Sequence, residues 1–297
     1  MPNFYLIYSV EVLLHEANPN GEVLGQTAFY KLLVELYHRL KIRNIDIKLP
    51  YFWYRYGTLL ESRSFMAQTG IDLLFFAPYK AHTRIIETVS DYPIPVHEKE
   101  IIQNEVRDLL SEYPPSDYLN IHIPSRLLDD NYKRTPLIFG KIFNREFFEY
   151  IKTLGINHLA FTGDEYSVIE EYLDTLMKHY PRKEIPELFN EYLKWDDTIR
   201  MIFELSDGSY FKMVEDFWFT YCLILRTKYY ENIIPEVITK WERDFLDFSL
   251  PEYSSRLDSE RERILTIYSG CQTNDEEINH IVDKAMLISR NSLINGE

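Results

Sequence analysis

The sequence predicts a mainly helical α+β protein. Only 10 of its 297 residues are glycine, and neither a GxGxxG nor a GxxxxGK[ST] pattern occurs. So few glycines disfavour folds that depend on phosphate-binding loops or on many tight hairpins. Long segments carry apolar residues at helical spacing, and two of them open with capping boxes, which indicates that helices dominate.

Composition indicates a folded chain in a reducing compartment. Hydrophobic residues make up 45% of the sequence and charged residues 27%, enough for a core and a solvated exterior. The two cysteines, Cys222 and Cys271, are far apart in the chain, so no disulfide framework is indicated. No apolar stretch approaches the roughly 20 residues that span a bilayer, and no signal peptide is recognisable. We therefore expect a cytoplasmic protein without a membrane partner.

The first part of the chain combines helices with extended segments. Apolar spacing predicts one helix over residues 3–16 and a second over residues 27–40. Alternation followed by an aromatic run predicts extended structure over residues 45–56, closed by Gly57. This part of the prediction is completed by a helix over residues 58–69, a strand over residues 71–77 and a short helix over residues 83–89.

Two prolines within residues 90–97 mark the predicted boundary between two domains. We assign residues 1–90 to a first module and residues 91–297 to an acidic helical domain. Residues 1–90 contain 9 lysines and arginines and 8 aspartates and glutamates. Residues 91–297 contain 23 lysines and arginines and 39 aspartates and glutamates. The second domain would therefore repel nucleic acid, whereas the first would not.

The second domain is predicted to be helical over most of its length. Helices are expected over residues 98–113 and 143–154, and residues 116–136 between them are expected to be irregular. The segment 211–225 is apolar on nearly all faces, so we expect it at the centre of the core. Further helix starts are indicated by capping boxes at Thr162 and Thr273 and by prolines at Pro186 and Pro235.

The predicted helix from Pro235 and the last predicted helix have clear patterns. Ile238, Trp241, Phe245 and Phe248 fall on one face at helical spacing, so we expect them to be buried together. The capping box at Thr273 is expected to open a final helix that reaches about residue 291.

A more specific pattern lies within residues 25–70. Helix, helix, strand, helix and strand in this size range is the layout of a winged helix. The helix with a lone lysine and the tyrosine–glycine turn resemble the winged-helix module of prokaryotic regulators and Panacea-type antitoxins. The residues that carry the resemblance are Gly25, Thr27, Lys31, Leu32, Tyr56 and Gly57. The resemblance implies a winged-helix-like N-terminal module in a regulatory protein.

In such a module, a basic set of side chains would face duplex DNA. The residues expected to contact phosphate are Lys31, Arg39, Lys41, Arg43, Lys48, Arg55 and Arg63. Binding through these cations would release counterions, so affinity would fall steeply with salt. The leading hypothesis is a cytosolic regulator or adaptor linked to nucleic acid: a transcription regulator, an antitoxin-like or a defence-associated component. Its helical domain would dimerise or hold a protein partner.

The same residues allow other interpretations. The cations are also typical of an ordinary solvated surface, and many winged helices bind protein without binding DNA. The aromatic run over residues 51–54 either packs as a strand or stacks on bases. Acidic side chains on helix faces are either solvated or dock on a basic partner; they are Glu170, Glu171, Asp174, Glu187 and Glu191.

Patterns typical of enzymes are weak. Asp46 and Lys48 have the D-x-K form of restriction-type nucleases, and Glu35 is the nearest upstream candidate for a further metal ligand. No histidine lies in HxH or HExxH spacing, no GxSxG occurs, and neither cysteine has a histidine nearby in the sequence. We expect no cofactor and no metal, and an enzyme is not favoured.

Overall fold

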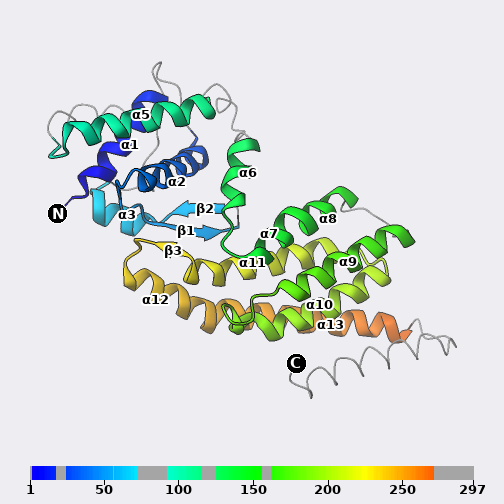
Figure 1. The fold of residues 1–297 in the computed structure, drawn as a ribbon. Coiled ribbons are helices and arrows are strands. Elements are labelled where there is room, and N and C mark those ends of the chain that lie inside the picture. The colour runs from blue at the N-terminus through cyan, green and yellow to red at the C-terminus, as the bar shows by residue number, and fades with distance from the viewer. Residues whose placement is uncertain are drawn as a thin grey trace.

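The computed structural model describes residues 2–17, 25–55, 57–71, 92–114, 125–155 and 162–270. This part of the chain is mainly helical, as expected from the sequence, and it carries a small three-stranded antiparallel sheet (Figure 1). The predicted strand and helix that would complete a winged helix lie almost entirely in residues 72–91, outside the described residues. The winged-helix layout of the first module therefore stays a prediction.

The N-terminal unit is built around three packed helices, α1, α2 and α5. Leu32 and Val106 are fully buried between them, and Leu127 of α6 belongs to the same hydrophobic core. This core therefore extends well past residue 90, as far as α6. The helices of this unit are α1 (Phe4–Ala17), α2 (Gln26–Ile42), α3 (Ser62–Thr69), α5 (Val96–Glu112) and α6 (Ser125–Lys133).

The C-terminal bundle surrounds a core of aromatic rings. The rings of Trp195 and Phe217 stack with centroids 4.7 Å apart, and Phe143 lies within 5.5 Å of both. Offset ring contacts of this kind add to the burial of a large apolar area. The bundle consists of α7 (Ile138–Lys141), η3 (Ile142–Phe147), α8 (Phe148–Leu154), α9 (Gly163–His179), η4 (Pro186–Leu188), α10 (Phe189–Glu204), α11 (Tyr210–Lys228), α12 (Pro235–Asp244), η5 (Phe245–Ser249) and α13 (Leu250–Gly270).

The expected central position of residues 211–225 is confirmed. They form most of α11, in which Val214, Phe217, Tyr221 and Leu225 are fully buried. Because the segment is apolar around nearly its whole circumference, it packs against helices on several sides, among them α8, α10, α12 and α13.

The sheet has the order β2-β1-β3 and begins with a hairpin. Tyr54 of β1 (Tyr51–Tyr54) pairs with Gly57 of β2 (Gly57–Leu60), and β3 (Tyr230–Glu231) pairs with the other edge of β1. The prediction that Gly57 ends the extended segment and a helix begins at residue 58 was wrong. With a φ of +90°, Gly57 lets the chain reverse, and α3 begins only at Ser62.

This sheet lies between the two helical units (Figure 1). On one side, the ring of Tyr51 packs edge-on against Tyr37 of α2, with centroids 5.6 Å apart. On the other side, the ring of Phe52 lies 4.7 Å from Trp241 of α12. Because β3 comes from the segment between α11 and α12, the sheet joins the N-terminal unit to the C-terminal bundle through main-chain pairing.

The carboxylate of Glu231 adds side-chain hydrogen bonds to that joint. It accepts hydrogen bonds from the hydroxyls of Tyr37 and Tyr51 and from the ammonium of Lys41, whose Nζ is 3.0 Å away. Burial would raise the pKa of Glu231, but the hydrogen bonds from Tyr37 and Lys41 hold it below its usual value. The joint between the units is therefore polar as well as apolar.

The helix signals that fall on described residues are confirmed, whereas the capping box at Thr273 and the final helix predicted after it lie outside the described residues. The side chain of Thr162 caps α9 in a capping box with Glu165, and Gly70 ends α3 in a left-handed conformation. Pro186 and Pro235 lie in the first turns of η4 and α12. These signals depend on a few neighbouring residues, which is why the sequence alone reveals them.

Two predictions that depend on packing were wrong. Residues 116–136 were expected to be irregular, but residues 125–133 form α6, which buries Leu127 and Asn131 on one face. Phe248 was expected to be buried with Phe245, yet it is 65% exposed. Residues Phe245–Ser249 form a π-helix, whose wider turn shifts the side chains that follow Phe245 away from the apolar face.

Substitution of Gly57 should test the hairpin. A Cβ at this position would lie 2.3 Å from Asn131 Oδ1 and 2.9 Å from Lys31 Nζ, in a backbone conformation that already disfavours side chains. Gly57→Ala should therefore lower the free energy of unfolding by roughly 3 kcal/mol. Gly70→Ala is the matched control, because Gly70 also has a positive φ but has no atom within 4 Å of the added Cβ. It should cost only about 1 kcal/mol, and equal losses in denaturant titrations would contradict the close packing at Gly57.

Candidate functional site

The cations predicted to bind nucleic acid are mostly engaged with carboxylates of the protein itself. Lys41 Nζ lies 3.0 Å from Glu231, and Arg43 Nε lies 2.7 Å from Glu105. Each carboxylate comes from an element remote in sequence, so these pairs connect elements of the fold. The remaining pairs are Arg39 with Glu112, Lys48 with Asp46 and Arg55 with Glu215.

The structure does not gather these cations on one face. Arg39 and Arg43 pair with α5, Lys41 pairs with β3, and Arg55 pairs with α11. Arg63 is exposed on α3, and it has no carboxylate within ion-pair distance in the described part of the chain. A phosphate backbone would have to compete with internal carboxylates at five of these positions, so much of their positive charge is already compensated within the protein.

Lys31 is fully buried, although it was predicted to contact phosphate. Its Nζ donates a hydrogen bond to Asn131 Oδ1 over 3.3 Å and lies against Gly57. Asn131 Oδ1 also accepts the backbone N–H of Thr58 at 3.0 Å, and Asn131 Nδ2 donates to Thr58 Oγ1 at 2.8 Å. Lys31 and Gly57, two residues of the winged-helix pattern, thus meet in a buried polar cluster.

This cluster closes the edge of the sheet. The side chain of Asn131 takes the place of a neighbouring strand at Thr58, so that the hydrogen-bonding edge of β2 is covered by α6. Burial lowers the pKa of Lys31 to about 8, and the nearby charge of Glu35 opposes this shift. No structural role was predicted for Asn131, because it follows Asp129 and Asp130 in a polar run that is typical of a loop.

A charged cavity of about 640 Å³ lies between α2, α5 and α6. Arg134 makes a bidentate contact with the buried carboxylate of Glu35, at 3.0 and 2.7 Å, and Arg126 bonds Glu112 at 2.8 Å. Four cations and four carboxylates of the described residues line this cavity, and their charges balance. They are Arg39, Arg126, Lys133 and Arg134, with Glu35, Glu112, Asp129 and Asp130.

The positions of Asp46, Lys48 and Glu35 do not support the nuclease interpretation. Lys48 Nζ binds Asp46 Oδ2 over 3.0 Å, and both carboxylate oxygens of Glu35 are taken by Arg134. Within the described ranges, no group of three or more His, Cys, Asp or Glu side chains could hold a metal ion.

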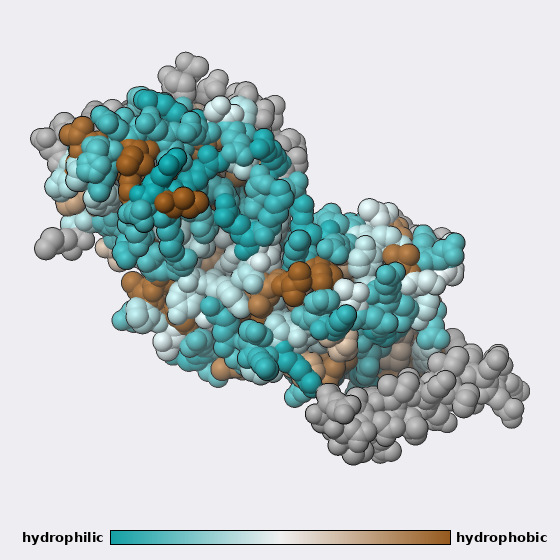
Figure 2. All heavy atoms as spheres, viewed as in Figure 1, coloured by the Kyte–Doolittle hydropathy of each residue, from teal (hydrophilic) through white to brown (hydrophobic). Residues whose placement is uncertain are grey.

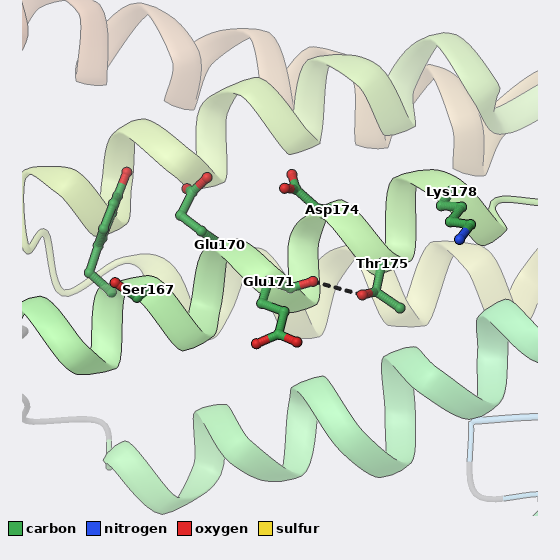
Figure 3. Close-up of a pocket in the computed structure, with 7 residues that line it drawn as sticks. Ser167, Glu170, Glu171, Asp174, Thr175 and Lys178 are labelled. Atoms are coloured by element: carbon green, nitrogen blue, oxygen red, sulfur yellow. Dashed lines mark hydrogen bonds between the residues drawn. The ribbon is translucent and has the colours of Figure 1, made fainter.

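A different surface, on α9, carries excess negative charge. We call it the α9 acidic surface; it lines a shallow pocket of about 500 Å³ and comprises Tyr166, Ser167, Glu170, Glu171, Asp174, Thr175 and Lys178. Glu170 and Asp174 point to the same side of α9, and Glu171 points away from them (Figure 3). Glu170, Glu171 and Asp174 are three of the acidic residues noted in the sequence.

Beside this surface, one arginine forms ion pairs with three carboxylates. Arg200 of α10 bonds Glu170, Asp174 at 3.0 Å and Asp196 at 3.0 Å. Burial raises the pKa of Asp196 to about 6, although the charge of Arg200 opposes this shift. The second oxygen of Glu170 is buried and has no hydrogen-bond partner among the described residues. One positive charge thus leaves the group of three carboxylates under-neutralised.

Comparison with known proteins adds no relative. No protein-family model, curated protein or solved structure matches the chain. None of the helices described is both long and apolar enough to cross a membrane. On the face shown in Figure 2, hydrophilic residues predominate and hydrophobic residues form small separate patches.

The burial of Lys31 should appear in the pH dependence of stability. Its pKa is about 8 in the folded chain and about 10.4 when unfolded, so the unfolded state binds more protons between these values. The contribution of Lys31 to stability should therefore rise with pH across this window, by roughly 3 kcal/mol in total.

The measurement compares wild type with Lys31→Met by denaturant unfolding from pH 7 to about pH 10. Taking the difference between the two proteins removes the titration of tyrosines, which is common to both. A difference that does not change with pH would mean that the Lys31 amine is solvated in the folded protein.

Proposed function

We propose that this protein is a protein-interaction module that presents the α9 acidic surface to a basic region of a partner. The observation that carries the proposal is the unequal distribution of charge compensation. The cations of the N-terminal unit are largely neutralised by internal ion pairs, whereas Glu170, Asp174 and Asp196 share Arg200. A surface with surplus carboxylates attracts lysine and arginine side chains and speeds their association.

Two details support α9 as the docking face. Asp174 is 76% exposed, so its carboxylate is accessible to a partner. Glu171 is exposed and has no ion pair within the described part of the chain. The proposal assigns no catalytic role to any residue.

The leading hypothesis from the sequence, duplex binding by the first module, is less well supported. Lys31 is buried, and five of the other six cations are paired with carboxylates at 3.0 Å or less. Binding a duplex would require these pairs to open, and the net charge of −15 opposes approach to DNA.

The α9 acidic surface can be tested with a lysine-rich peptide carrying a fluorescent label. The full chain should bind this peptide with an affinity that falls as salt is added. A variant that combines Glu170→Gln, Glu171→Gln and Asp174→Asn should bind the peptide roughly tenfold more weakly. Each exposed ion pair between a carboxylate of α9 and a lysine of the peptide contributes about 0.5 kcal/mol. Fluorescence anisotropy gives the dissociation constants.

The matched control removes three charges elsewhere. The control variant carries Glu236→Gln, Glu242→Gln and Asp247→Asn. The three replaced residues lie on α12 and η5, are exposed, and make no ion pair within the described residues. This variant changes net charge by the same amount, so it should bind the peptide almost as well as wild type. Equal weakening in both triple variants would show that attraction is unspecific and would remove α9 as the docking face.

A second titration separates protein binding from duplex binding. The full chain should show no binding of a labelled DNA duplex near physiological salt. Salt-dependent duplex binding that is lost in an Arg39→Gln, Arg43→Gln variant would instead favour the nucleic-acid hypothesis.

A further inference from the structure

Arg226 occupies an unusual environment between α11 and α12. The side chain is half-buried, and its guanidinium lies over the ring of Trp241, 5.0 Å from the ring centroid. Trp241 packs in turn against Phe52 of β1, with centroids 4.7 Å apart. A guanidinium stacked on an aromatic face is held in one plane, with its N–H edge directed away from the ring.

Arg226 also lacks the partner that comparable arginines have. Among the described residues, the other half-buried arginines each lie within ion-pair distance of a carboxylate; they are Arg39, Arg55, Arg145, Arg200 and Arg261. Arg226 has no such carboxylate, and its Nε has no hydrogen-bond partner, in the part of the chain that the structure describes. The nearby Asp244 acts on it only at longer range and lies 3.9 Å from Lys240.

A missing counter-charge is costly for a half-buried cation. Buried donors are almost always hydrogen-bonded, and a charge that is partly removed from water requires compensation. The chain contains 47 aspartates and glutamates, so a shortage of carboxylates does not explain the gap. Because Nε itself is buried, an external carboxylate would form its two parallel hydrogen bonds with the Nη1 and Nη2 edge of the guanidinium.

We propose that Arg226 and Trp241 form a recognition element for a protein segment that inserts an aspartate or glutamate carboxylate against the guanidinium. Tryptophan and arginine are the residue types that most often dominate binding energy at protein interfaces. This element differs from the α9 acidic surface in location and in the charge that it selects.

The test selects peptides from a displayed random-peptide library on the full chain, with excess lysine-rich peptide present to occupy the α9 acidic surface. The selected peptides should share an aspartate or glutamate. Their binding to Arg226→Gln should be weaker by roughly tenfold or more, since loss of one partner of a desolvated charge pair has at least this effect. Trp241→Leu should also weaken them, because the guanidinium is then no longer held in one plane.

Arg243→Gln is the matched control, since Arg243 is an exposed arginine on α12 that has no ion pair in the described residues. It should leave binding of the selected peptides unchanged, and thermal unfolding should show that all three variants remain folded. The proposal is overturned if the library yields no binder, if the selected peptides lack an acidic residue, or if Arg226→Gln binds them as well as wild type. These outcomes leave the lysine-rich peptide test of α9 unaffected.

Discussion

The pairing of β1 with β3 is the contact on which the arrangement of the whole molecule depends. β3 is only two residues long, yet it links a strand of the N-terminal unit to the segment between α11 and α12 of the bundle. A two-residue ladder would be marginal alone. It is supported by Glu231, which receives hydrogen bonds from α2 and β1, and by the contact of Phe52 with Trp241. Main-chain, polar and apolar interactions thus coincide at one place.

The distribution of charge follows from the same architecture. Arginines and lysines of the N-terminal unit bind carboxylates on other elements, such as Arg55 of the hairpin with Glu215 of α11. Individually, partly exposed pairs add little stability, but they restrict how the elements can be oriented. A cation used in this way is largely lost to an external phosphate. Counting basic residues along the chain therefore overestimated the charge that the unit can offer to a partner.

Features that depend on a few neighbouring residues could be predicted from the sequence, whereas features that depend on contacts between distant residues could not. The capping box at Thr162 and the glycine that ends α3 could be read from a few neighbouring residues, and the apolar circumference of α11 predicted its central place. The hairpin at Gly57, by contrast, depends on space shared with Lys31 and Asn131. Apart from Asp46, which is two residues from Lys48, the carboxylate partners of the paired cations lie beyond residue 100, so no pattern in the first ninety residues could indicate them. Likewise, nothing in the sequence distinguishes Arg226 or Trp241. The contact between them arises only because α11 and α12 pack against each other.

The uneven placement of tryptophan has a consequence for spectroscopy. Trp195 and Trp218 are buried in the aromatic core of the bundle, whereas Trp53 and Trp241 lie at the sheet that joins the two units. The core formed by α1, α2 and α5 contains tyrosine and phenylalanine but none of the chain's four tryptophans. Intrinsic tryptophan emission will therefore register loosening of the bundle or of the joint, while the N-terminal core could open without changing it.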